Sequence, residues 1–179
     1  MHERRVSAGI IRLLRGDITR QTADAIVTAA NSGLRGGGGV DGAVHRAAGS
    51  KLLEACRKIG GCRTGSAVLT PSFDLEARGV KCVIHAVGPI WSGGGNHEPE
   101  HLASAYSTAL DLADEAGCRS IAFPSISTGV YGFPVEKAAP IAVSAARSFL
   151  EHKPRTLSEI YFVLFDDDTF DAFERALSE

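Results

Sequence analysis

Short apolar runs alternate with segments of helical periodicity along the whole chain, and this alternation restricts the fold more than any other feature. Strands that are apolar throughout, with helices between them, are typical of a parallel sheet covered on both faces. We therefore expect an α/β fold with a largely parallel sheet. In such folds ligands bind beyond the carboxyl ends of the strands, so the loops that follow the strands are the places to search for a site. The pattern predicts strands at 9–14, 25–28, 66–70, 82–87, 120–123 and 160–165, helices at 40–48, 51–59, 99–116 and 170–177, and a further helix that opens at Pro134.

The composition is that of an ordinary folded domain with little affinity for polyanions. We expect a monomer, because no exposed apolar stripe stands out in the sequence. The chain has 179 residues, of which 44% are hydrophobic, and a formal net charge of −2, and its length suits a single domain over residues 1–179. That charge argues against broad binding to nucleic acid or to an anionic membrane, and no apolar run approaches membrane-spanning length. The cysteines show no CxxC pair and no zinc-finger spacing, which favours reduced thiols, no metal and a cytoplasmic location. They are Cys56, Cys62, Cys82 and Cys118.

Four consecutive glycines, residues 36–39, follow the predicted strand 25–28 and directly precede a predicted helix. Successive glycines let the backbone turn its N–H groups toward an anion, and the helix N-terminus adds a favourable dipole. The alternative is a flexible surface turn. The candidate ligand-binding residues of this glycine loop are Gly37, Gly38, Gly39 and Val40.

Three polar side chains flank the glycine loop. Asp41 and His45 lie four residues apart and share one face at the start of the helix, and Asn31 stands where the strand ends. Each has an ordinary structural explanation: a helix cap, a core histidine and a turn residue, respectively. A carboxylate, an imidazole and a carboxamide around one glycine loop is a less ordinary combination, and these three residues are the candidate catalytic residues.

A second loop follows the predicted strand 120–123 and reads Ser125-Ile-Ser-Thr-Gly-Val-Tyr-Gly-Phe-Pro134. Gly129 and Gly132 would let backbone N–H groups wrap a diphosphate, and Tyr131 and Phe133 could wall a sugar. The alternative is a well-capped turn with aromatic core residues. Two such loops at the same end of one sheet fit an elongated ligand with two phosphates.

Two further candidates lie at the ends of the first and last apolar runs. Asp17 could accept a hydrogen bond from an exocyclic amine such as that of adenine, although a cap on a short helical turn is the stronger explanation from the sequence alone. Phe165 could stack on a purine, whereas a core phenylalanine is the ordinary expectation.

Five stretches of the chain together resemble the macrodomain family, in particular its MacroD-type branch. The resemblance spans nearly the whole chain in the family's order. It implies a three-layer α/β/α sandwich with a central mixed, mostly parallel sheet that binds ADP-ribose. The stretches are Gly16-Asp-Ile-Thr19, Asp24-Ala-Ile-Val-Thr-Ala-Ala-Asn31, Gly36-Gly-Gly-Gly-Val-Asp-Gly-Ala-Val-His45, His85-Ala-Val-Gly-Pro-Ile-Trp91 and Ser125-Ile-Ser-Thr-Gly-Val-Tyr-Gly-Phe-Pro134.

The resemblance also implies a role for each candidate residue. Asp17, with the backbone of Ile18 beside it, would bind the adenine amino group, and Phe165 would lie near the adenine face. The glycine loop would embrace the distal ribose, where three residues match those that MacroD-type enzymes use: Asn31, Asp41 and His45. The diphosphate would be held by Ser127, Thr128, Gly129, Val130 and Tyr131.

By this likeness the chain is expected to be a hydrolase that acts at the distal ribose without a metal or a cofactor. The expected reactions are release of mono-ADP-ribose from Glu or Asp esters on proteins and deacetylation of O-acetyl-ADP-ribose. Its partners would be ADP-ribose or an ADP-ribosylated protein, with nucleic acid only as an ADP-ribosylated acceptor. The alternatives are a reader that binds ADP-ribose without turnover, an ADP-ribose 1″-phosphate phosphatase and a general nucleotide-sugar binder.

One position departs from the family pattern. The family usually reads Asn-Ala-Ala-Asn at the end of this strand, whereas the chain has Thr28-Ala-Ala-Asn31. Threonine suits a strand because it is β-branched, but its hydroxyl has less reach than a carboxamide and offers one donor rather than two. We expect Asn31 to keep its contact with the ribose, and we expect any effect of Thr28 to fall on the order of the glycine loop.

Overall fold

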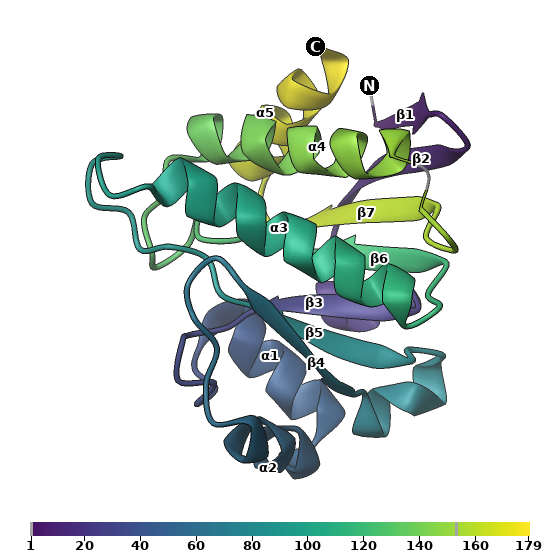
Figure 1. Ribbon diagram of the computed structural model, residues 1–179, viewed down its shortest axis with the longest axis vertical. Helices are drawn as coiled ribbons and strands as arrows, with labels where there is room; N and C mark the ends of the chain where they lie inside the picture. Colours follow the sequence, from purple (N-terminus) through teal and green to yellow (C-terminus); the bar gives the residue numbers. More distant parts are fainter. Residues whose placement is uncertain (1, 153) are drawn as a thin grey trace.

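A mixed seven-stranded sheet forms the centre of the computed structural model, which describes residues 2–152 and 154–179 (Figure 1). The strands are β1 (Glu3–Val6), β2 (Gly9–Arg15), β3 (Ala25–Ala29), β4 (Ala67–Pro71), β5 (Cys82–Ala86), β6 (Ser120–Phe123) and β7 (Glu159–Leu164). They lie in the order β1-β2-β7-β6-β3-β5-β4. The five inner strands are parallel, and only the edge strands β1 and β4 run antiparallel to their neighbours. The expected mixed, mostly parallel sheet is therefore confirmed.

Helices cover both faces of the sheet, as the three-layer expectation requires. The helices are α1 (Gly39–Ala48), α2 (Ser50–Ile59), α3 (Glu98–Glu115), α4 (Val135–Glu151) and α5 (Asp167–Ser178), with short 3₁₀ turns at Ile18–Arg20 and Phe73–Arg78. The face that carries α3 and α4 is toward the viewer in Figure 1, and α1 lies behind the sheet. Among the described residues, no helix combines the length and the apolar character that crossing a membrane requires.

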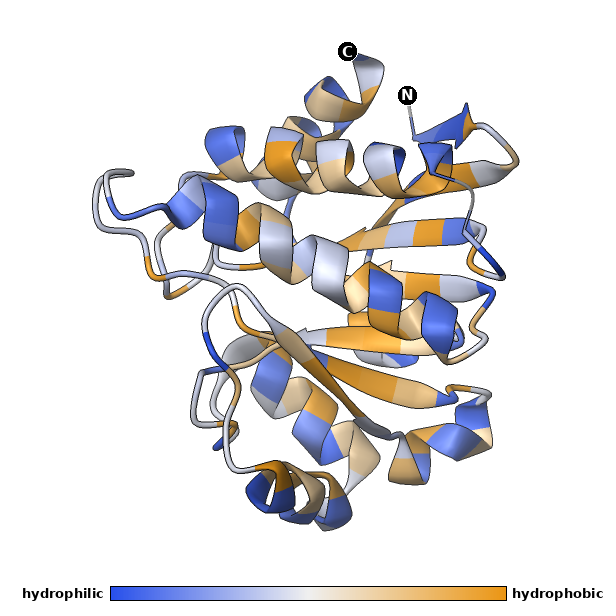
Figure 2. Ribbon diagram, in the orientation of Figure 1, coloured by the Kyte–Doolittle hydropathy of each residue, from blue (hydrophilic) through white to orange (hydrophobic). Residues whose placement is uncertain are grey.

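The side chains of β3 illustrate how one buried strand serves both layers. Successive side chains of a strand point to opposite faces. Ile26 accordingly packs in the core beneath α1, and Val27 packs in the larger core beneath α3 and α4. Strands β3 and β5 are mostly orange on the hydropathy scale of Figure 2, because neither of their faces meets water.

A cluster of aromatic rings fills the core between β6, β7 and the helices α3 and α5. The ring centroid of Phe162 lies 5.7 Å from that of Phe123, 6.1 Å from that of Tyr106 and 5.1 Å from that of Phe173. All four side chains are almost completely buried. This cluster joins the sheet to both the middle and the end of the chain.

The first strand was not expected from the sequence. Glu3–Val6 is polar and alternates between exposed and half-buried positions, so it lacks the continuous apolar pattern of the other strands. It forms because it pairs with β2, with Val6 opposite Gly9 across a tight hairpin.

The cysteines agree with the expectation of free thiols, and Cys56, Cys82 and Cys118 are buried.

Replacing a ring in the aromatic cluster should destabilise the fold. We expect Phe162→Ala to lower the free energy of unfolding by about 3–5 kcal/mol, because it removes buried apolar contacts and leaves a cavity. Phe165→Ala makes the same chemical change three residues later, where the ring is 78% exposed, and should change stability by less than about 0.5 kcal/mol. Denaturant unfolding measures both, and equal losses in the two variants would contradict this view of the core.

Candidate functional site

The carboxyl ends of the parallel strands bring the candidate residues to one edge of the sheet. Asp17 follows β2, Asn31 follows β3 and Phe165 follows β7, while the loop of residues 124–134 follows β6. Because β2, β7, β6, β3 and β5 are parallel, all these loops emerge at the same edge. They lie toward the left of the molecule in Figure 1.

The glycine loop presents a row of backbone donors. Helix α1 begins at Gly39 with Gly38 as its N-cap, so the loop leads directly into a helix N-terminus. In the part of the chain that the structure describes, the backbone N–H groups of residues 36–41 have no protein acceptor. A row of free N–H groups at the positive end of a helix is suited to an anion.

Some glycines of this region are required by the fold, and others leave open space beside the loop. Gly39 has a φ of 58°, which favours glycine, and a Cβ on Gly42 would lie 2.4 Å from the carbonyl oxygen of Gly37. The fold therefore needs glycine at 39 and 42. A Cβ on Gly37 or Gly38 would meet no atom of residues 2–152 or 154–179 within 4 Å. The protein itself does not require glycine at those two positions, and the space beside them is open to a ligand.

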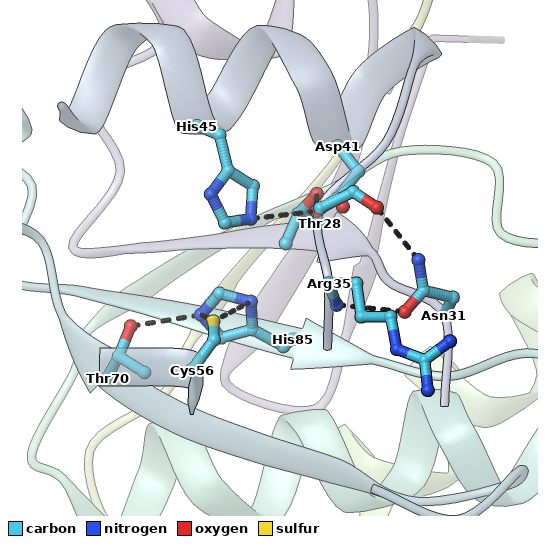
Figure 3. Close-up of polar contacts among 9 residues, drawn as sticks. Thr28, Asn31, Arg35, Asp41, His45, Cys56, Thr70 and His85 are labelled. Atoms are coloured by element: carbon cyan, nitrogen blue, oxygen red, sulfur yellow. Dashed lines mark hydrogen bonds and ion pairs between the residues drawn. The ribbon is translucent and has the colours of Figure 1, made fainter. Parts of the chain in front are cut away.

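Asn31 holds the loop through its carboxamide. Its Nδ2 donates to the carbonyl oxygen of Gly36 at 2.8 Å, and its Oδ1 accepts from the backbone N–H of Arg35 at 3.0 Å (Figure 3). Asn31 is thus a turn-ordering residue, as the ordinary explanation proposed. One of its two amide protons is left over from these contacts.

Asp41 is a buried carboxylate on the first turn of α1. Gly38 is the N-cap, so Asp41 does not cap the helix. Its side chain instead meets β3, where the hydroxyl of Thr28 donates to Oδ1 at 2.9 Å, and Nε2 of His45 lies 3.6 Å from the same oxygen (Figure 3). Burial raises the pKa of Asp41, while the Thr28 hydrogen bond and the charge of His45 lower it. The net upward shift in pKa makes Asp41 a stronger base than an exposed aspartate.

The second loop, residues 124–134, also presents unpaired donors. It is closed by hydrogen bonds from Gly132 N to Gly129 O at 3.0 Å and from Phe133 N to Ser127 O at 2.9 Å. Within the described residues, the N–H groups of 127–131 have no protein acceptor. Ser127 has a φ of 68°, and its buried hydroxyl has no hydrogen-bond partner in the described part of the chain either. Thr128 bonds back to Ser125, and Val130 is fully exposed at the tip.

Of the two outer candidates, Asp17 fits its ordinary structural explanation and Phe165 does not. Asp17 does cap a 3₁₀ turn: its Oδ1 accepts from the hydroxyl of Thr19 at 2.7 Å and from the backbone N–H of Thr19 at 2.9 Å, and these bonds lower its pKa. Its side chain remains 45% exposed. Phe165 is not a core residue, because its ring lies largely in solvent beyond the end of β7. The side chain of Ile18 is buried, so only its backbone is available.

Three side chains beneath α1 have the atom types of a metal site: His45, Cys56 and His85, with ligand atoms within 4.8 Å of one another. The Sγ of Cys56 lies 3.8 and 3.9 Å from the two ring nitrogens of His85, so it is on the lone-pair axis of neither. Burial raises the pKa of the Cys56 thiol, and the charge of Asp41 adds to that rise. A metal ligand needs the thiolate, so this geometry fits a packed neutral thiol and imidazole better than a metal centre.

Glu98 is a structural contributor to this edge that the sequence pattern did not reveal. Its buried carboxylate accepts backbone N–H bonds from Ser92 at 2.9 Å, Gly94 at 2.9 Å and Asn96 at 2.6 Å. These bonds pin the glycine-rich segment 92–96 in place. The same loop reaches the second one, because Trp91 N donates to Tyr131 O at 2.8 Å. An acidic residue at the start of a helix, next to a glycine-rich loop, was the signal available in the sequence.

Comparisons with known proteins fit this architecture. The family model described as Macro domain matches residues 27–142, and the chain therefore belongs to the Macro domain family. A Chlorobaculum tepidum protein named only "Macro domain-containing protein CT2219" is 53% identical over 169 residues, which cover 94% of this chain and 96% of that protein. A Cronobacter turicensis protein named "O-acetyl-ADP-ribose deacetylase" is 48% identical over 176 residues, covering 96% and 98%. The solved Oceanobacillus iheyensis macrodomain with ADP superposes with a TM-score of 0.92 at 38% identity, covering 98% of this chain and 94% of that one.

The contacts of Glu98 lead to a prediction about stability and pH. Its pKa is lowered from 4.5 to about 2, chiefly by the hydrogen bond from Ser92 N. The stability that it contributes is therefore present above pH 4.5 and is lost as the pH falls toward 2. We expect Glu98→Gln to lower the melting temperature at neutral pH and to flatten the fall in melting temperature on acidification. Glu100→Gln, an exposed change on the same helical turn, is the control, and an identical pH dependence in the two variants would contradict the assignment.

Proposed function

We propose that this protein is a hydrolase that binds ADP-ribose along the carboxyl edge of its sheet and cleaves an ester at the distal ribose. The substrates would be mono-ADP-ribose esters of Glu or Asp side chains, O-acetyl-ADP-ribose, or both. The observation that carries the proposal is the buried carboxylate of Asp41, whose pKa is raised and which stands beside a row of free backbone donors. The name of the Cronobacter relative and the ADP in the Oceanobacillus structure support the same ligand class.

In this proposal the ligand lies across both loops. The N–H groups of residues 127–131 would bind the diphosphate, and those of residues 37–40 would bind the distal ribose and its neighbouring phosphate. The exposed side of the Asp17 carboxylate would accept from the adenine amino group, beside the backbone of Ile18. The exposed ring of Phe165 would stack on the adenine.

Hydrolysis would then use Asp41 as a general base. Water adds to the acyl carbon as one of its protons passes to Asp41, the bond between that carbon and the ribose oxygen breaks, and the proton returns to the ribose oxygen. The products are a carboxylic acid and a free ribose hydroxyl. Asn31 orders the loop and offers its remaining amide proton to the ribose, and His45 helps to position Asp41. The proposed route needs no metal or cofactor and no covalent intermediate with the enzyme.

A reader module that binds ADP-ribose without turnover is the alternative from a different class, and a 1″-phosphate phosphatase is the alternative reaction. A reader does not need a buried carboxylate with a raised pKa beside the distal ribose, because burying a charge is costly. That cost favours the enzyme. A side-by-side assay of an ADP-ribosylated protein, O-acetyl-ADP-ribose and ADP-ribose 1″-phosphate separates these possibilities.

We further propose that residues 1–179 work as one macrodomain, as a monomer and in the cytoplasm. Free thiols support the last point, because disulfides are rare in that reducing compartment. The expected partners remain ADP-ribose and ADP-ribosylated proteins.

Removing the proposed base should separate binding from turnover. We expect Asp41→Ala to bind ADP-ribose in calorimetry within a few-fold of the wild type, and its rate of ADP-ribose release to fall by roughly 10²–10⁴-fold, which is the usual contribution of a general base. Asn31→Ala should also lose most release while still binding. Asp171→Ala, an exposed aspartate on α5, is the control. Full activity in both site variants would overturn the assignment.

The adenine contact can be tested independently. Phe165→Ala should weaken ADP-ribose binding by about 1–3 kcal/mol, the usual value of a base stacked on an aromatic ring. The exposed ring contributes little to the fold, so the loss reports on binding rather than on stability. The loss should appear in the dissociation constant and in KM rather than in kcat. Unchanged affinity for ADP-ribose in calorimetry would remove Phe165 from the site.

A further inference from the structure

Thr28 occupies a buried position beneath α1, and packing alone does not explain why a threonine stands there. It lies on β3 between β5 and β6, and its side chain is completely buried. Like Ile26 two residues earlier, it faces the layer that contains α1. A buried hydroxyl at a strand position that would accept valine is costly unless it makes a hydrogen bond. The partner of this hydroxyl therefore indicates its purpose.

The only hydrogen bond that the hydroxyl makes among the described residues is with Asp41. Thr28 Oγ1 donates to Asp41 Oδ1 at 2.9 Å, and both groups are buried (Figure 3). No donor within the described part of the chain reaches the second carboxylate oxygen, Oδ2. Asp41 is thus held by one oxygen and keeps the other free for a water or a ribose hydroxyl.

We propose that Thr28 is a positioning residue for Asp41, which fixes the orientation of the carboxylate and stabilises its ionised form. The inference rests on the proposed function, in which Asp41 is the base. The pairing of Thr28 with His85 of β5 fixes the backbone from which the hydroxyl extends, and a β-branched side chain has few rotamers to choose from.

Few groups around Asp41 other than Thr28 stabilise its ionised form. From α1, His45 approaches Oδ1 at 3.6 Å. From α2, the Cys56 thiol is uncharged because its pKa is raised. From β5, His85 is neutral near pH 7, since burial and the charge of His45 lower its pKa to about 4. No lysine or arginine forms an ion pair with Asp41 in the described residues, so the Thr28 hydroxyl and His45 are the groups that favour its ionised form.

The test compares Thr28→Val, which keeps the shape but removes the hydroxyl, with Thr28→Ser, which keeps the hydroxyl. Losing the donor should raise the pKa of Asp41, so the acidic limb of the pH–rate profile should move to higher pH in Thr28→Val. We expect kcat on the best of the three substrates to fall roughly ten- to hundredfold through lost orientation, with KM and ADP-ribose affinity nearly unchanged. Thr28→Ser should restore most of kcat and the position of the limb.

A matched control and a readout independent of turnover complete the experiment. Thr70→Val removes a buried hydroxyl from the edge strand β4, which lies beyond β5, and that hydroxyl contacts His85 rather than Asp41. This change should leave the limb in place. The ¹³C carboxyl signal of Asp41, followed by NMR against pH, should titrate at higher pH in Thr28→Val than in the wild type. An unshifted titration, or a kcat and limb equal to those of the wild type, would overturn the role of Thr28. If Asp41 titrates at higher pH in Thr28→Val but the wild type releases product from none of the substrates, the proposed function alone is overturned.

Discussion

Five parallel strands that end along one edge of the sheet are the constraint on which the rest of the structure depends. Asp17, Asn31 and Phe165 lie far apart in the sequence, and they come to the same edge because each follows the carboxyl end of such a strand. The same constraint places the glycine loop and the loop of residues 124–134 at this edge of the sheet. The two edge strands run the other way and bring no candidate residue to this region.

Most of the proposed recognition is built from backbone rather than from side chains. Among the residues that the structure describes, 36–41 and 127–131 have backbone N–H groups without protein acceptors. Such groups are tolerable only where water or a ligand can reach them. An anion that replaces this water meets donors already in place, so little ordering is needed on binding. In the adjoining loop, by contrast, three backbone N–H groups are held by a side chain, because they donate to the buried carboxylate of Glu98.

The sequence predicted the parts of the fold that follow from local pattern. The apolar strands, the glycine loop and the helix after it were visible because each has a period or a composition of its own. The edge strand at Glu3–Val6 was not, since its pattern is polar and it exists only through its partner β2. The exposure of Phe165 could not be foreseen either, because an apolar residue at the end of a buried run looks like part of it. The contact between Thr28 and Asp41 joins residues 13 positions apart on two different elements, so no local pattern encodes it.

That contact also bears on the proposed role of Asp41 as a general base, for which burial alone is not enough. Burial raises the pKa of Asp41 and strengthens it as a base, but beyond a point it would leave the carboxyl protonated and inert at neutral pH. A hydroxyl that donates to one oxygen opposes this rise, and it does so without introducing a charge that would compete for the ligand. It also removes the rotational freedom of the carboxylate, because one oxygen is committed and the other is not. In the proposed mechanism, a single buried threonine therefore sets both the ionisation and the orientation of the base.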